Sequence, residues 1–280
     1  MTLGERFAGH TVSSALATRA TTDANAAYLR FGDHLLTYGQ VESDAEALAA
    51  ALASLGLEAG DRLALVLTPR PEFAVAMFAA AKLGVDMLAA PVSGNAKVVS
   101  AGKLTIVASG PRKSFEMAEP YLQALGVGVT YVGEGELARM VKICHNLLLG
   151  VVAQSLAEIT VLAEKGGVKR SAFLEFINNS VMGSQFSRYK TPAFVNLDWT
   201  PTFTPVLLRK DLDLGLKAAK ELGVPLPVTK VTRGEIDKLV QAGHTDCDFA
   251  ILIEQAANAS GLKLTPENVA VDDGLKKKSA

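Results

Sequence analysis

The spacing of apolar and polar residues predicts mixed structure in the first half of the chain and helices in the second. Two short runs, Ala27–Phe31 and His34–Tyr38, flank Gly32-Asp33 and predict a β-hairpin, because this pair suits a tight turn. An alanine-rich stretch from Gln40 to Leu55 has helical spacing, and Pro71 stands at a favoured first-turn position of a helix ending at Leu83.

Short, mostly apolar runs predict strands at 62–68, 85–90, 103–108 and 127–132. A short helix at 114–125 precedes the last of them. The helix that begins at Pro71 lies between the first two strands, so this unit could complete a parallel sheet with the other two.

From residue 136 onward the pattern is helical, with expected helices at 136–165, 171–181, 206–222, 227–242 and 247–260. The stretch from Leu147 to Ala163 is apolar enough to suggest a membrane span. A central Glu158 would cost such a span about 2–3 kcal/mol, so a helix buried in protein is the better interpretation. The expected fold class is an α/β N-terminal part with an incomplete Rossmann-like parallel sheet, followed by an all-α C-terminal domain built on one long buried helix.

Composition narrows the possible partners. Of 280 residues, 49% are apolar and 20% charged, and the net charge of −1 leaves no basic excess for binding nucleic acid. The four histidines are scattered without ligand spacing, so no metal site is expected. Cys144 and Cys247 form no paired motif, which together with the lack of a signal peptide favours a reducing cytoplasm.

Residues that could take part in catalysis or substrate binding stand at two places in the sequence. Ser93-Gly94 ends a short apolar run, and Lys142 and Asn146 stand four apart, on one face of the long helix. An amine, an amide and a hydroxyl could grip a small carboxylate and move a proton on its hydroxyl group. The neighbours of Lys142 are nearly all apolar, so a lowered pKa is expected for its ammonium.

Four blocks of sequence carry a resemblance that begins near Val85 and runs to the C-terminus. They are Ala90–Gly94 with Ser100–Ile106, Gly133–Gly135 leading to Lys142 and Asn146, Phe203 with Leu207 and Lys210-Asp211, and Gly243–Phe249. In this order they resemble the β-hydroxyacid dehydrogenases, relatives of 3-hydroxyisobutyrate dehydrogenase. The resemblance implies an NAD- or NADP-dependent oxidation of a small hydroxy acid by a homo-oligomer.

The resemblance also implies roles for single residues. Lys142 would be the catalytic acid and base, and Ser93, Gly94 and Asn146 would bind the substrate. Phe203 and Lys210 would contact the cofactor, although Lys210-Asp211 also reads as an ordinary surface pair. His145 stands where the family usually has another asparagine, and its direction, about 100° from Asn146, favours a packing role.

Residues 11–84 resemble another family, the N-terminal start of acyl-CoA synthetases and other adenylate-forming ligases. Its carriers are Leu36-Thr37-Tyr38, Gly60-Asp61-Arg62 and Pro69–Phe73, but the ligases' phosphate loop is absent. The expected domains are therefore a synthetase-like fragment at 1–84, a remnant of a Rossmann domain at 85–135 and a helical dehydrogenase domain at 136–280.

A complete dehydrogenase of the resembled family would begin with a strand and Gly-x-Gly-x-x-Gly. The first 90 residues contain no such string. Two hypotheses therefore stay open: an NAD(P)-dependent enzyme whose activity is impaired by this loss, and a non-catalytic fusion product that retains a helical dimerisation domain. An active adenylating enzyme is disfavoured.

Overall fold

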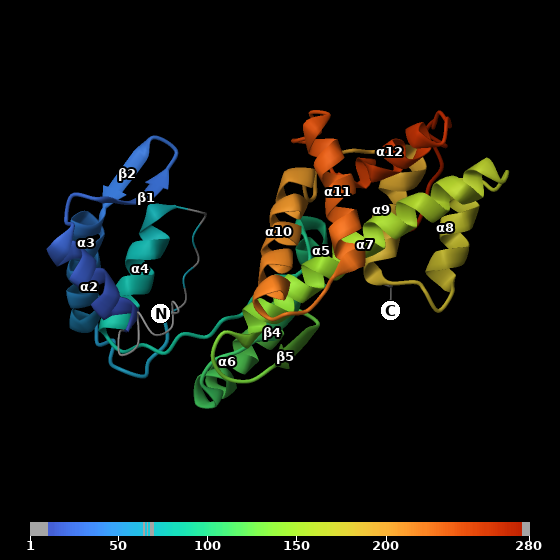
Figure 1. The fold of residues 1–280 in the computed structure, drawn as a ribbon. Helices are drawn as coiled ribbons and strands as arrows, with labels where there is room; N and C mark the ends of the chain where they lie inside the picture. The colour runs from blue at the N-terminus through green and yellow to red at the C-terminus, as the bar shows by residue number, and fades with distance from the viewer. Residues whose placement is uncertain (1–10, 64, 66, 68–69, 276–280) are drawn as a thin grey trace. The chain divides into compact units, whose positions relative to one another are not determined.

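The structure is a computed structural model that describes residues 11–63, 65, 67 and 70–275 (Figure 1). Its residues divide into two compact units. The N-terminal unit comprises residues 1–89, 109–118 and 133–135, and the C-terminal unit comprises 90–108, 119–132 and 136–280. Each unit is described on its own below.

In the N-terminal unit, the described residues form a hairpin of β1 (Ala27–Phe31) and β2 (His34–Thr37) and the helices α2 (Val12–Thr22), α3 (Tyr38–Ser54) and α4 (Pro71–Lys82). The predicted hairpin is confirmed, with Phe31 opposite His34 in an antiparallel pair. Thr37 ends the hairpin and caps α3, because its side chain accepts from the backbone N–H of Gln40 while the Gln40 side chain accepts from Thr37. Buried residues from α2, α3 and α4 make a small core: Leu16, Val41, Ala45, Val75 and Phe78.

Two predicted strands are not present as predicted. The described residues of 62–68 are not in a strand, and residues 64, 66 and 68 lie outside the described part of the chain. The run 85–90 is also not a strand: Met87 is 48% exposed, so this run is not covered on both faces, and Ala89 makes only an isolated bridge with Ser109. The observed strand β3 begins at Val92, two residues after the end of the predicted strand.

The sheet of the C-terminal unit has three short strands in the order β3 (Val92–Ser93), β4 (Thr105–Ala108), β5 (Gly128–Tyr131). The pair of β4 and β5 is parallel, as predicted, whereas β3 is antiparallel to β4 and places Ser93 opposite Thr105. Two further helices belong to this region, α5 (Ala96–Ser100) and α6 (Arg112–Leu125), of which the second spans the boundary between the units. The incomplete α/β part of the predicted fold class is confirmed.

The rest of the C-terminal unit is helical, as predicted: α7 (Leu137–Lys165), α8 (Arg170–Asn179), α9 (Gln185–Asn196), α10 (Pro205–Glu221), α11 (Pro227–Gln241), the 3-10 turn η1 (Phe249–Ile251) and α12 (Leu252–Ala259). The sequence pattern missed α9 because Pro192 stands inside it, where proline removes a hydrogen-bond donor. A capping box of Ser184 and Ser187 begins that helix and was the available signal.

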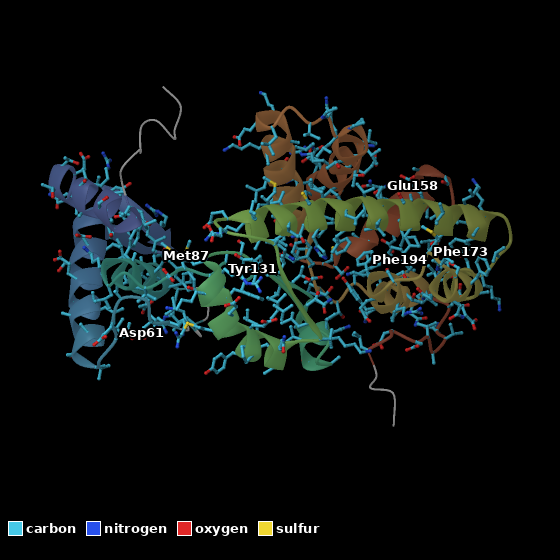
Figure 2. All side chains as sticks on the ribbon, turned by 90° about the horizontal axis from the view of Figure 1, so that it is seen from below. Asp61, Met87, Tyr131, Glu158, Phe173 and Phe194 are labelled. Carbon is cyan, nitrogen blue, oxygen red and sulfur yellow. The ribbon has the colours of Figure 1, made fainter. Side chains whose placement is uncertain are left out.

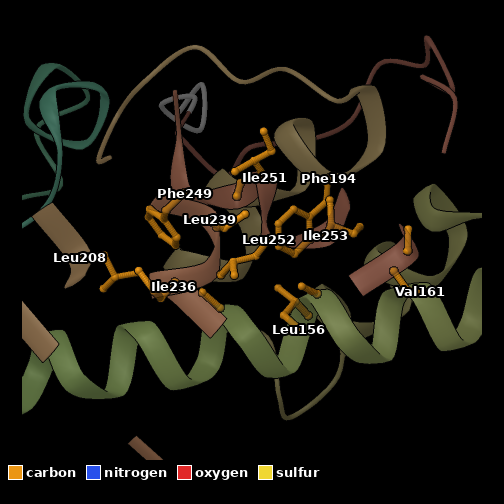
Figure 3. Close-up of a cluster of buried hydrophobic side chains, with 14 of the residues drawn as sticks. Leu156, Val161, Phe194, Leu208, Ile236, Leu239, Phe249, Ile251, Leu252 and Ile253 are labelled. Atoms are coloured by element: carbon orange, nitrogen blue, oxygen red, sulfur yellow. The ribbon is translucent and has the colours of Figure 1, made fainter. Parts of the chain in front are cut away.

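Side chains from all these helices form one core along α7. Leu156 and Val161 of α7 face Phe194, Leu252 and Ile253 (Figure 3). Phe194 of α9 is 1% exposed, and Phe173 of α8 packs against the same cluster (Figure 2). The prediction that the helical half packs around its long first helix is confirmed.

The face of α7 that lies opposite this core is exposed. It carries a stripe of apolar residues, each at least 36% exposed: Leu137, Val141, Leu148, Val152, Ile159 and Leu162. Their spacing of three, four and seven places all of them on one side of the helix. By length and composition alone α7 could cross a membrane, but 44% of its most apolar window is buried within the protein.

One buried cation ties the C-terminal segment to the helical core. The Arg170 guanidinium is fully buried and forms an ion pair with Glu164 at 2.6 Å. It also donates to the backbone carbonyls of Phe194, Val195 and Thr265. Because every strong donor of a buried guanidinium needs an acceptor, this residue fixes the segment after α12 against α7, α8 and α9.

Candidate active site

A cavity of about 780 Å³ opens in the C-terminal unit, beside the N-terminal half of α7. Its walls come from β3 and the loop after it, β4, α7, α9, the loop before α10 and η1. Its polar and charged lining residues are Ser93, Asn95, Lys103, Thr105, Lys142, His145, Asn146, Ser184, Gln185, Tyr189 and Thr202. Apolar residues of α7, together with Phe186, Phe203 and Phe249, line the remainder.

Five of the six predicted site residues line this one cavity: Ser93, Gly94, Lys142, Asn146 and Phe203. Ser93 reaches it from the end of β3, about fifty residues before the two α7 positions in sequence. Gly94 has a φ of +144°, and a Cβ there would lie 2.8 Å from Val98. Glycine is therefore required at this position by the packing of the loop, in addition to any approach of a ligand.

Lys142 is half-buried in the first turns of α7. Burial lowers the pKa of its ammonium below the ordinary value, the negative charge of Asp211 opposes that shift, and the positive charge of Lys210 adds to it. Among the described residues, no side chain lies within hydrogen-bond or ion-pair distance of the Lys142 ammonium. The other lining cation, Lys103, donates to the carbonyl of Gly274. Lys142 therefore has its donors available to a ligand.

A chain of hydrogen bonds links the other predicted residues. The Ser93 Oγ lies 2.9 Å from the Nε2 of His145, and the His145 Nδ1 lies 2.9 Å from the Oδ1 of Asn146. The Asn146 Nδ2 donates to Asp211 at 2.6 Å, and Asp211 is ion-paired with Lys210 at 2.9 Å. The packing role expected for His145 is wrong, because both of its ring nitrogens take part in this chain.

Lys210 does not line the cavity. Its side chain is 58% exposed and meets the site only through Asp211, which is largely buried. Sequence reasoning noted the pair Lys210-Asp211 but assigned the role to the lysine. The signal that favoured Asp211 was its position on the apolar-facing side of α10, next to the buried Leu212.

A second buried network supports the far wall of the cavity. Lys190 is 2% exposed and Asp248 is 1% exposed, and their charged groups lie 2.6 Å apart. Thr202 donates to Asp248 through both its backbone N–H and its hydroxyl. Burial alone would raise the pKa of Asp248, but the Lys190 charge and these hydrogen bonds outweigh it and lower that pKa.

This network holds aromatic side chains that face the cavity. The Lys190 ammonium lies 4.2 Å from the centre of the Phe249 ring, and Phe249 meets Phe203 edge to face at 6.1 Å. Burial and the Asp248 charge raise the pKa of Tyr189, which keeps its hydroxyl protonated near neutral pH. The spacing of Lys190 and Asp248 in sequence, 58 residues, gave no signal of their pairing.

The described residues contain no group of three or more histidine, cysteine, aspartate or glutamate side chains placed to hold a metal ion. The chemistry available in the cavity is that of an unpaired amine, a hydroxyl–imidazole–amide chain and an apolar aromatic wall. Such a site can bind an anion of small size and exchange a proton with it.

Comparison with known proteins supports both resemblances. Residues 136–256 match the family described as NAD-binding of NADP-dependent 3-hydroxyisobutyrate dehydrogenase, and residues 16–93 match the family of AMP-binding enzymes. The second match ends at Ser93, which is the first residue in the sequence that lines the cavity.

Several curated relatives are similar to this chain over part of their length. The 2-(hydroxymethyl)glutarate dehydrogenase of Eubacterium barkeri is 40% identical over 54% of this chain and 50% of its own. The L-threonate dehydrogenase of Cupriavidus necator is 30% identical over 72% of this chain and 69% of its own. The chain spans between half and three fifths of the length of several other such relatives.

Solved structures agree on the fold. The crystal structure of 3-hydroxyisobutyrate dehydrogenase from Salmonella typhimurium is similar with a TM-score of 0.57 and 27% identity, covering 76% of this chain and 65% of that one.

Proposed function

Because the chain belongs to the β-hydroxyacid dehydrogenases, the family of 3-hydroxyisobutyrate dehydrogenase, we propose that its cavity binds a small hydroxy acid and that Lys142 carries the proton of the reaction. The observation that carries this proposal is the half-buried Lys142 ammonium, with a lowered pKa and no partner among the described residues, on the wall of a cavity that also presents Ser93 and Asn146.

The step follows from the properties of the amine. In the neutral form Lys142 accepts the proton of the substrate hydroxyl while the carbon beneath loses a hydride, so an alcohol becomes a carbonyl group. In reverse, the ammonium returns the proton to the carbonyl oxygen. NAD or NADP, when bound, supplies the hydride acceptor. Asn146 orients the substrate, and the apolar wall of Phe203 and Phe249 excludes water from the reacting carbon.

The residues of the cavity suit the nicotinamide ring of such a cofactor better than its pyrophosphate. The aromatic wall and Phe203 suit the flat nicotinamide ring. A pyrophosphate needs free backbone N–H groups at a helix N-terminus. The first 90 residues offer no Gly-x-Gly-x-x-Gly loop for this purpose, and the glycine pair before α7 is tied to the preceding loop, since the Gly133 and Gly135 carbonyls accept from Gly110 and Ser109. Glu136, beside the first turn of α7, is ion-paired with Arg139 at 2.6 Å, so this pair adds no net positive charge for a phosphate. We therefore infer weak cofactor binding, with Lys210 as an outer contact.

The test of the proposal is a coenzyme-linked assay with L-threonate, 3-hydroxyisobutyrate and 2-(hydroxymethyl)glutarate, which the names of the relatives suggest. Lys142→Ala should lower turnover about a hundredfold, the usual scale for a positioned acid or base. Its melting temperature should change little or rise, because alanine is the best helix former and the half-buried amine is costly. Lys238→Ala, at an exposed site on α11, is the control. Full activity of Lys142→Ala would remove the proposal.

The exposed stripe on α7 supports a homodimer, whether or not the chain turns over substrate. Its apolar side chains lie on one side of a long helix, which is the feature expected of a protein contact. Light scattering should give twice the chain mass, and Ile159→Glu with Leu162→Glu, at two stripe positions outside the cavity, should give the monomer. A monomer in the unchanged protein would contradict this.

Cys144 and Cys247 are both free thiols, which suits a protein of the reducing cytoplasm.

A further inference from the structure

The hydrogen-bond chain from Asp211 to Ser93 has a fixed direction. Asp211 is ion-paired with Lys210, and a carboxylate can only accept hydrogen bonds. The side-chain nitrogen of Asn146 must therefore face Asp211, where it donates at 2.6 Å. This leaves the Asn146 oxygen toward His145, so the Nδ1 of His145, at 2.9 Å from that oxygen, carries a proton.

The direction decides what Ser93 can do. In a neutral imidazole only one ring nitrogen carries a proton, so the Nε2 of His145 is bare when Nδ1 is protonated. The Ser93 hydroxyl, 2.9 Å from Nε2, then donates its proton to His145. Ser93 presents only lone pairs to the cavity in this state, and lone pairs repel a carboxylate.

Protonation of His145 reverses the direction of the hydrogen bond between His145 and Ser93. The Nε2–H of the imidazolium donates to the Ser93 oxygen, and the Ser93 proton becomes free to turn into the cavity. The link between His145 and Asn146 is unchanged, because Nδ1 donates in both states. The imidazolium also brings a positive charge next to the place where an anion would lie.

We propose that His145 makes this site bind carboxylates together with a proton, so that each hydroxy acid bound in neutral to alkaline buffer takes up one proton on His145. The inference rests on the proposed substrate class and goes beyond it, since it assigns to His145 the control of what Ser93 presents. A ligand that donates a hydrogen bond itself, such as an amide, binds Ser93 without any proton.

Other ionisable groups lie in the same cavity or in the same chain of hydrogen bonds and ion pairs as His145. They are Lys142 on α7, Lys103 before β4, Tyr189 on α9, and Lys210 and Asp211 on α10. Lys103 is engaged with Gly274, and Lys210 is paired with Asp211. Lys142 is the other group that could gain a proton with an anionic ligand, because burial favours its neutral form. The test must therefore separate His145 from Lys142.

The experiment is calorimetric titration of the full chain, without nicotinamide cofactor, with 3-hydroxyisobutyrate and with its amide. Two buffers of different ionisation enthalpy, both at about pH 8, give the number of protons taken up on binding. We expect one proton for the acid and none for the amide. The affinity for the acid should fall about tenfold per unit of pH, as the uptake of one proton requires.

Three variants assign the proton. His145→Asn replaces the imidazole with an amide that can donate to Ser93 without titrating, so the acid should bind with no proton uptake. His244→Asn, the same change outside the cavity, and Lys142→Met should both keep the uptake. The ring C–H resonance of His145, identified by its loss in His145→Asn, should shift to the imidazolium position when the acid is added to the unchanged protein.

The outcomes separate this inference from the proposed function. Proton uptake on His145 without NAD(P)-linked oxidation would leave the inference standing and remove the oxidation. Oxidation of the acid with no proton taken up on binding would remove the inference. Uptake that persists in His145→Asn but disappears in Lys142→Met would also overturn it, as would failure of the acid to bind at any pH.

Discussion

Two lysines beside the same cavity lie in opposite environments. Lys190 is almost fully buried and has a carboxylate at 2.6 Å, a hydroxyl at 3.0 Å and an aromatic ring beneath it. Lys142 is half-buried, and among the described residues no partner lies within reach of its ammonium. A lysine whose donors are all used holds structure, whereas one that is partly desolvated and unpaired is ready to exchange a proton. The comparison therefore separates a structural lysine from a chemical one.

The largest expected effect is on stability at Lys190. Lys190→Met leaves the Asp248 carboxylate buried without its counter-charge and should lower the free energy of unfolding by about 3–5 kcal/mol. Lys238→Met, which breaks the more exposed pair with Glu235, should change it by less than about 1 kcal/mol. Urea unfolding of both variants measures the difference. Equal, small losses would mean that Lys190 does not hold the wall of the cavity.

Cofactor affinity should show the next largest effect. The first 90 residues lack Gly-x-Gly-x-x-Gly, so the backbone N–H groups that such a loop offers to a pyrophosphate are missing there. We expect NAD(H) and NADP(H) to bind at least tenfold more weakly than to full-length relatives, a loss of roughly 1.4 kcal/mol or more. Calorimetric titration with each nucleotide checks this. Micromolar affinity for either one would show that other residues replace the missing loop.

Asn146 and Lys142 should differ in their effects on substrate binding and turnover. Asn146→Ala should raise KM and lower turnover, each by several-fold, because a neutral hydrogen bond is worth about 1 kcal/mol and the amide orients the substrate in both states. Lys142→Ala should lower turnover with a smaller change in KM. Steady-state kinetics of the two variants side by side separates these patterns. Identical patterns would mean that the two residues act as one structural unit.

The smallest expected effect is the pH dependence of stability at Lys142. Its pKa is lowered in the folded protein and ordinary, at 10.5, in the unfolded chain. Below the folded pKa both states carry the proton, so the full cost of burying the charge is present. The cost disappears as the pH rises from the folded pKa to 10.5. Lys142→Met should therefore be the more stable protein near pH 7, and the gap should close in alkaline buffer.

The sequence predicted the fold class and most of the helices because their apolar spacing is local. It predicted the gathering of Ser93, Lys142, Asn146 and Phe203 through family resemblance, and the cavity brings these four together. Three features depended on contacts distant in sequence: the pair of Lys190 and Asp248, the short antiparallel β3, and the place of His145 in the hydrogen-bond chain.

His145 shows why such features could not be predicted from the local sequence pattern. Its angle from Asn146 was estimated correctly as one residue step of the helix, and that angle suggested a side chain turned away from the site. The cavity, however, is wide enough to be lined by Lys142, His145, Asn146 and Leu149 together. A step of 100° along α7 therefore keeps a side chain within the same wall.

The most direct test of the comparison is the titration of the two lysines themselves. Competitive acylation of the native protein over a range of pH, read by mass spectrometry at each lysine, gives the pKa and reactivity of each amine without any substrate. We expect Lys142 to titrate below the ordinary lysine value and to react readily, and Lys190 to stay unmodified until the protein unfolds. A pKa of Lys142 at or above the ordinary value would contradict its role as the proton carrier.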